Sequence, residues 1–144
     1  QYRAIRWRTI HRMSRSEHAR SLAASDPVIA DRNITVESIS DDCTVVSMPI
    51  QPSMCNAYNI GHGAYIFMIA DVAMSLASSV EDGTALASSA HIDWLKPVEM
   101  NDTVRATATC QYASGRQARW IITVTDGNDE PVAIFRGRTQ QIRK

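Results

Sequence analysis

The chain has 144 residues, of which 44% are hydrophobic and 21% are charged. This length and composition are typical of one globular domain with a hydrophobic core of its own. The formal net charge is zero, so no overall positive field attracts nucleic acid or an anionic membrane, and we expect neither as a partner.

The first residues carry an excess of arginine. Arginines stand at positions 3, 6, 8, 12, 15 and 20, against the single acid Glu17. We interpret residues 1–12 as a basic N-terminal extension and residues 13–144 as a single domain. A loosely packed terminus is the plain interpretation. An organellar targeting segment, or non-native residues before a natural start at Met13, stay open as alternatives.

The next segment predicts a short helix followed by a hairpin. A capping box of the S-x-x-E form starts a predicted helix at Arg15–Ala24. The helix ends before Pro27, because the residue before a proline is pushed out of helical geometry. Two segments rich in β-branched residues, 34–39 and 43–50, then predict strands joined by a tight turn.

The most informative stretch is the loop 51–61 and the apolar run after it. The run Tyr65–Val80 is apolar on nearly every side, which is typical of a buried helix, and Gly83 is suited to its C-terminal end. Asp71 interrupts the run, and a buried carboxylate is costly unless something pairs with it or uses it. At the other end, His62-Gly63 opens the helix, where free N–H groups and the helix dipole can hold an oxyanion. An acid and an oxyanion site are much of what ester or thioester hydrolysis needs.

The rest of the chain predicts four strands joined mostly by hairpins, at 85–95, 103–112, 117–125 and 131–142. Hairpins imply an antiparallel sheet. A strongly curved sheet wrapped around the long helix covers most of its apolar surface, and a second subunit can cover the remainder. The predicted fold class is therefore α+β.

The cysteines indicate the compartment. Cys43, Cys55 and Cys110 are odd in number and lack metal-ligand spacing. We therefore expect no disulfide framework and no metal, but a reducing, cytoplasmic environment. The longest apolar run is shorter than the ~20 residues that span a bilayer, so no membrane segment is expected.

Helix geometry predicts where an active site would lie. Asp71 follows Gly63 by eight residues, which is about 12 Å along a helix axis. Reacting atoms must approach within about 3–3.5 Å, so one helix cannot bring its own Gly63 N–H and Asp71 to one carbonyl. Two antiparallel copies can, and we therefore expect a site shared between subunits and repeated by symmetry.

These residues resemble a known family. Met54-Cys55-Asn56, then His62-Gly63-Ala64 after five intervening residues, then Asp71, is similar to the motif of the hotdog-fold acyl-CoA thioesterases, most of all the phenylacetyl-CoA (hydroxyphenylacetyl-CoA) type. The resemblance extends from about Met13 to the C-terminus. Other matching segments are Ile92–Pro97, Asn101–Thr103 and Val132–Arg138. The resemblance implies a hotdog fold, in which a curved antiparallel sheet wraps a long central helix, and a homodimer or a homotetramer built of two dimers.

The resemblance also implies roles. Gly63 would give its N–H to the thioester carbonyl, and Asp71 of the other subunit would be the nucleophile or the general base. Asn56 and His62 would shape the loop and position the thioester or water. No cofactor is implied, because coenzyme A arrives within the substrate. Ala64 replaces a second glycine common in the family, and its methyl group would narrow the acyl tunnel. It joins the substrate-binding candidates, which also include Ser75, Ser88 and Ser89.

Each residue also has a plainer role. Asp71 could be a buried acid hydrogen-bonded across a helix pair, Gly63 a tight start to the helix, and Asn56 a loop cap. For His62, orienting the loop is favoured over proton chemistry, and for Ser75 a bond to its own helix is favoured over holding a water. Four cations are candidates for the coenzyme A phosphates, with solvated charge as the default: Lys96, Arg116, Arg136 and Arg138.

The leading hypothesis is hydrolysis of an acyl-CoA or aryl-CoA to the free acid and coenzyme A. A hotdog-type dehydratase, a non-catalytic acyl-CoA-binding module and a scaffold subunit are the alternatives. The acyl group, the exact role of Asp71 and the arrangement of a tetramer are not specified by the sequence.

Overall fold

The computed structural model describes residues 13–80 and 83–142. The basic extension expected at residues 1–12 lies outside them. The elements in chain order are α1 (Arg15–Ser25), α2 (Pro27–Asp31), β1 (Thr35–Ile39), β2 (Thr44–Pro49), a 3-10 turn η1 (Pro52–Met54), α3 (Gly63–Ala77), β3 (Thr84–Trp94), β4 (Thr103–Ser114), β5 (Gln117–Thr125) and β6 (Pro131–Ile142).

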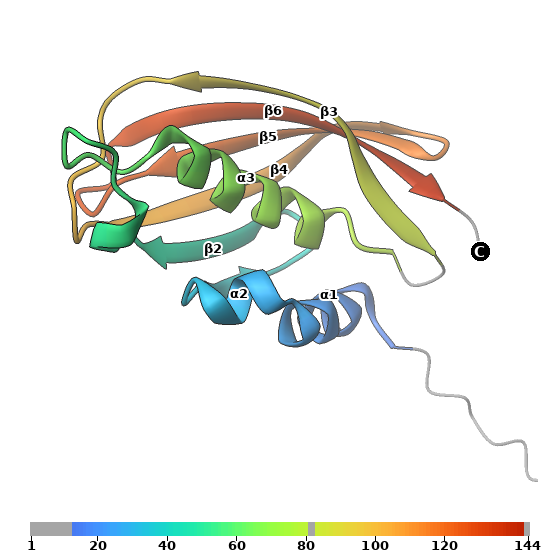
Figure 1. The fold of residues 1–144 in the computed structure, drawn as a ribbon. Helices are drawn as coiled ribbons and strands as arrows, with labels where there is room; N and C mark the ends of the chain where they lie inside the picture. Colours follow the sequence, from blue (N-terminus) through green and yellow to red (C-terminus); the bar gives the residue numbers. More distant parts are fainter. Residues whose placement is uncertain (1–12, 81–82, 143–144) are drawn as a thin grey trace, which may run out of the picture.

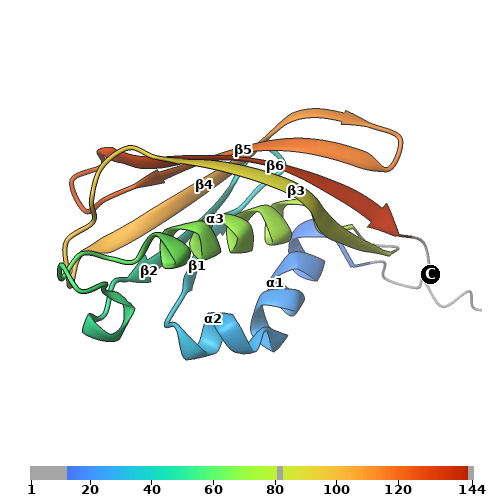
Figure 2. The same ribbon diagram turned by 45° about the horizontal axis from the view of Figure 1, so that its top comes forward.

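The described strands form one six-stranded sheet in the order β1-β2-β4-β5-β6-β3, and every neighbouring pair is antiparallel. The sheet curves over α3, while α1 and α2 lie on the side of α3 away from it (Figures 1 and 2). This confirms the predicted α+β class and the hotdog architecture, a long helix wrapped by an antiparallel sheet.

The core lies between α3 and the concave side of the sheet. Ile69, Ala73 and Met74 of α3 are fully buried, and the Phe67 ring meets Phe135 of β6 edge-on, with the ring centroids 5.0 Å apart. A Cβ atom added to Gly137 of β6 would lie 2.2 Å from the Met74 Sδ atom. The glycine thus lets the helix approach the sheet closely, which fixes the face that α3 presents to the strands.

The predicted end of the long helix is wrong. The helix ends at Ala77 rather than Val80, and Gly83, at φ +142°, is not its left-handed cap. Two side-chain contacts end it, one local and one from a distant part of the chain. The Ser78 hydroxyl donates to the Ser75 carbonyl, which competes with the helical pattern, and the Arg15 guanidinium donates to the Ala77 carbonyl over 2.8 Å. Apolar composition alone carries neither signal.

The short helix α2 was not predicted from the sequence. The Asp26 side chain accepts from the Val28 N–H at 2.9 Å, and Pro27 occupies the first helical position. A proline suits that position because its missing N–H would be unpaired there anyway. The proline that ends α1 at Ser25, one residue beyond the predicted end, therefore also starts α2.

The sequence predicted that α3 is buried on nearly every side. Within one chain this prediction is wrong. Ala64 and Ser75 are exposed, and Phe67, Met68 and Asp71 are only half-buried. These five residues recur at three- and four-residue spacing, so they form one stripe along the helix. We call these five residues the open stripe of α3.

Two sequence expectations concern the chain's surroundings. Cys43, Cys55 and Cys110 are free thiols. Within the described ranges, no helix is both long and apolar enough to cross a membrane.

Arg15 joins three elements, because its guanidinium also donates to the Ser40 carbonyl in the β1–β2 turn. Arg15→Ala is expected to lower the free energy of unfolding by about 2 kcal/mol, since charged donors to backbone carbonyls are lost. Urea denaturation measures this. Arg20→Ala, an exposed position on the same helix, is the matched control, and equal stability of the two variants would contradict the assignment.

Candidate active site

Asn56 organises the loop before α3. Its side-chain Oδ1 accepts from the backbone N–H of Tyr58 at 2.9 Å and of Ile60 at 3.3 Å, and its own N–H donates to the Ile60 carbonyl at 2.8 Å. Cys55 and Gly61 pair across the same loop. Asn56 therefore holds the loop closed, which is the plainer of its two predicted roles.

His62 is the N-cap of α3. Its Nδ1 atom accepts from the Ala64 N–H at 3.3 Å, and its backbone N–H donates to the Met54 carbonyl at 2.8 Å. The imidazole is exposed. These contacts match the favoured role, because they fix where the helix begins.

Gly63 is the first residue of α3. The first N–H groups of a helix have no intrahelical acceptor, and the positive end of the helix dipole lies there. The Gly63 N–H makes no hydrogen bond to another part of the described chain. The sequence-predicted oxyanion donor is therefore available for a carbonyl oxygen.

Trp94, which we did not predict as a site residue, lies directly against this donor. Its indole N–H donates to the Gly63 carbonyl over 3.1 Å. A Cβ atom at position 63 would lie 3.0 Å from the indole Nε1, so any larger residue there would have to push the indole back by a few tenths of an ångström. Alternation along the strand puts Trp94 on the same face as Ala90 and Ile92, which is a sequence signal for its position but not for its contact with Gly63.

Two cavities open at Gly63 and Trp94. The larger has a volume of about 540 Å³, is almost wholly apolar, and is otherwise lined by His62, Ala64 and Phe67. The other, of about 350 Å³, is lined mainly by the chain segments 60–61 and 94–98. A small ligand that reached the Gly63 N–H would have space on both sides.

Asp71 is half-buried on the open stripe of α3, with Ser75 one turn further on. Its carboxylate makes no hydrogen bond or ion pair with the described residues, so no contact inside its own chain explains it. Burial raises the pKa of the Asp71 carboxyl above its ordinary value, because the charged form is less well solvated there. A carboxylate of raised pKa is also a stronger base.

The structure does not bring Gly63 and Asp71 together within one chain. Eight residues of regular helix separate them, which is about 12 Å along the axis. Phe67 of the open stripe contacts Phe135 of β6, but the Asp71 carboxylate on the same stripe has no hydrogen-bonding or ionic partner among the described residues.

The two strand serines lie away from Gly63. Ser88 and Arg138 make two hydrogen bonds of 3.2 Å each. The serine hydroxyl donates to the Arg138 carbonyl and accepts from the Arg138 Nε. Ser89 lines a separate cavity of about 290 Å³ beside His91 and Arg136. It is five residues from Trp94, or about 16 Å along a strand. One chain alone therefore does not place either serine at the helix start.

Three of the four candidate phosphate-binding cations already have partners. Lys96 pairs with Glu130 and with Asp126, the latter over 2.9 Å, and these carboxylates raise the pKa of Lys96. Arg136 pairs with Asp93 over 3.4 Å. Arg138 donates to Ser88. Coenzyme A phosphate contacts at these residues and at Arg116 stay predictions.

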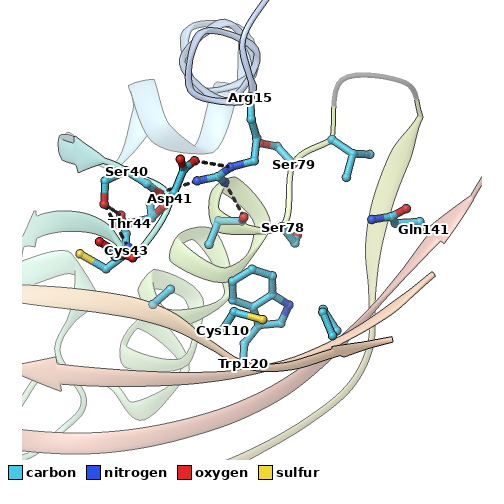
Figure 3. A pocket seen from close by; sticks show the side chains of 16 residues that line it. Arg15, Ser40, Asp41, Cys43, Thr44, Ser78, Ser79, Cys110, Trp120 and Gln141 are labelled. Atoms are coloured by element: carbon cyan, nitrogen blue, oxygen red, sulfur yellow. Dashed lines mark hydrogen bonds and ion pairs between the residues drawn. The ribbon is translucent and has the colours of Figure 1, made fainter. Parts of the chain in front are cut away.

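A further cavity, of about 190 Å³, lies at the opposite end of α3, between Arg15 and the Trp120 ring (Figure 3). The hydroxyls of Thr44 and Ser79 on its wall are buried without a hydrogen-bond partner. Ala77, which also lines it, is fourteen residues from Gly63, or about 21 Å along the helix. This cavity is therefore not part of the candidate site.

The described ranges contain no group of three or more His, Cys, Asp or Glu side chains that could hold a metal ion.

Comparison with known proteins agrees with this geometry. Residues 58–133, more than half of the chain, match the family model described as the thioesterase superfamily. The protein belongs to the thioesterase superfamily and is a thioester hydrolase. The matched segment begins in the loop before α3 and ends in β6, so it includes His62, Gly63 and Asp71.

Particular relatives cover nearly the whole chain. The acyl-coenzyme A thioesterase PaaI of Escherichia coli is 28% identical over 126 residues, which are 88% of this chain and 90% of the relative. The solved structure of the E. coli PaaI protein from the phenylacetic acid degradation operon aligns with a TM-score of 0.85 at 26% identity, over 91% of this chain and 96% of that one. A phenylacetic acid degradation protein PaaI from Thermus thermophilus aligns with a TM-score of 0.76 at 26% identity, over 81% of this chain and 100% of that one.

Asp71→Asn is expected to raise the melting temperature at pH 7. Because the native pKa of Asp71 lies above the unfolded value, the ionised carboxylate destabilises the fold above the native pKa. This cost disappears below the unfolded pKa, near 3.9. The gain in the variant should therefore vanish as the pH falls toward about 4. Thermal melts at both pH values measure it, with exposed Asp42→Asn as the control. A variant that melts lower at pH 7 would show that the carboxylate has a stabilising partner.

Proposed function

We propose that the protein hydrolyses an acyl-CoA or aryl-CoA thioester at an active site formed by two copies of the chain. One observation carries the proposal: among the described residues neither the Gly63 N–H nor the Asp71 carboxylate has a partner, and the two residues stand on the same helix about 12 Å apart along its axis. Each group is half of a hydrolytic site, and neither meets its other half among the described residues of its own chain.

A two-fold axis would complete the site. If two α3 helices run antiparallel across the axis, the start of one lies beside the middle of the other, and Gly63 of one copy meets Asp71 of the second. The contact is isologous, so two equal sites form. The open stripe of α3 is the surface that the second copy would cover. A homodimer is thus the smallest active unit, and a homotetramer would be a pair of such dimers.

The chemistry follows from these two groups. The thioester carbonyl oxygen would accept from the Gly63 N–H, whose preorganised dipole stabilises the negative charge of the tetrahedral transition state. Asp71 of the other copy would act on the carbonyl carbon as the nucleophile, or take the proton from an attacking water. Either route adds water across the C–S bond and releases the acid and the coenzyme A thiol. No cofactor takes part.

The loop residues would hold this arrangement. The His62 cap sets the first residue of α3, and the Asn56 side chain keeps the loop in position. Ala64 and Ser75, exposed on the open stripe, would contact the substrate beside the two reacting groups. Ser88 and Ser89 would reach it from β3 of the second copy.

The relatives support the substrate class. The E. coli relative is named an acyl-coenzyme A thioesterase, and its solved structure is described as that of a protein from the phenylacetic acid degradation operon. An acyl-CoA or an aryl-CoA such as phenylacetyl-CoA is therefore the first substrate to test. We further propose a cytoplasmic enzyme, with organellar targeting as the alternative, and no nucleic-acid or membrane partner.

Asp71→Asn tests the role of the acid. The variant is expected to fold and to lose at least about a hundredfold in acyl-CoA hydrolysis, because an amide can neither attack nor accept the proton. Thiol release from acetyl-, hexanoyl- and phenylacetyl-CoA measures it. Asp42→Asn, at an exposed turn, should retain full activity. Turnover of Asp71→Asn within a few-fold of the wild type would refute this role.

A further inference from the structure

Trp94, the last residue of β3, is held at the oxyanion end of α3. Its indole N–H donates to the Gly63 carbonyl over 3.1 Å, so the ring cannot turn away from the first turn of the helix. Yet the residue is 55% exposed, although an indole is among the largest apolar surfaces that a protein can bury. A large apolar ring is therefore fixed, and left open, beside the free Gly63 N–H.

The two cavities at this ring differ in their linings. The larger one contains only His62 as a polar side chain, with Phe67 and Ala64 completing the wall. The other is also lined mainly by apolar side chains, but its border adds Lys96 and the backbone of the loop at Gly61. A thioester carbonyl carbon bound at the Gly63 N–H carries two substituents, the acyl group and the thiol arm of coenzyme A. These substituents require two spaces that meet at Gly63.

We propose that Trp94 determines specificity by forming the acyl subsite, in which an aromatic acyl group lies in the Phe67-lined cavity against the indole. This inference rests on the proposed function. The thiol arm of coenzyme A contains amides that would lose hydrogen bonds to water in an apolar cavity, so it leaves on the Lys96 side. An aromatic acyl group binds favourably in the Phe67-lined cavity, because Trp94 and Phe67 offer ring faces and edges for aromatic contacts.

The indole is not what holds the helix start in place. His62 caps α3 through the Ala64 N–H, and the Gly61 N–H donates to the Val98 carbonyl at 2.8 Å. Both contacts remain when the ring is removed. The Gly63 N–H should therefore keep its position in a Trp94 variant, and the loss should be selective for substrates that touch the ring.

The test compares kcat/KM for phenylacetyl-CoA and acetyl-CoA in the wild type, Trp94→Ala and Trp94→Phe. Acetyl-CoA shares the thioester and the coenzyme A arm but has only a methyl group in the subsite. Trp94→Ala should lose about tenfold or more on phenylacetyl-CoA, mostly in KM, and less than about threefold on acetyl-CoA. Trp94→Phe should recover most of the loss. Tyr112→Ala, which removes an exposed aromatic of β4 outside both cavities, should change neither substrate.

Three results would overturn the inference. Equal losses of kcat/KM on both substrates would make Trp94 a structural residue, and an unchanged kcat/KM for phenylacetyl-CoA would remove it from the subsite. A Trp94→Ala protein that elutes as a smaller species in size-exclusion chromatography would show that the indole contacts a second copy instead. A wild type that hydrolyses neither substrate would refute the proposed function itself. Failure of the proposed function is therefore distinguishable from failure of the Trp94 inference.

Discussion

The rise of the α-helix is the constraint on which the account depends. Gly63 and Asp71 belong to one continuous helix, so about 12 Å separates them whatever the side chains do. The Gly63 N–H can stabilise an oxyanion because it is the first in the helix, and Asp71 can act because its face of α3 is left open. In the proposed mechanism, neither property contributes to hydrolysis until the α3 start of a second copy lies beside Asp71.

Close approaches between backbone and side chains set which face of α3 stays open. Gly137 lets Met74 come against β6 where any Cβ atom would collide with its sulfur, and so presses one face of the helix onto the sheet. Gly63 likewise lets the Trp94 indole lie close to the backbone at the start of α3. With both contacts made, α3 cannot rotate without losing buried packing. Asp71 is therefore held on the uncovered side.

Local signals in the sequence predicted α1, α3 and the six strands but not α2, while distant contacts decided where α3 ends and which side chain lies against Gly63. The capping box before Arg15 and the hairpin turns depend on neighbouring residues, and the structure has them. The end of α3 depends on Arg15, 62 residues away from Ala77, which no periodicity reveals. Likewise, the loop and His62-Gly63 pointed to the oxyanion donor, but the contact of Trp94 with Gly63 spans 31 residues and was missed as a site feature.

Subunit complementation tests the shared site most directly. Gly63→Pro removes the oxyanion N–H at a position where helices accept proline, and His62 at φ −61°, ψ 132° already has the backbone that precedes a proline. The proline Cβ atom would lie 3.0 Å from the indole Nε1 of Trp94, so this exposed ring must shift by a few tenths of an ångström. Asp71→Asn removes the acid. Each homodimer should be inactive. Random association of equal amounts makes about half of the dimers mixed, and one of the two sites in a mixed dimer is intact. The mixture should therefore regain about a quarter of wild-type activity. If folded chains of both variants form mixed dimers without regaining activity, the site is not shared and the account is wrong.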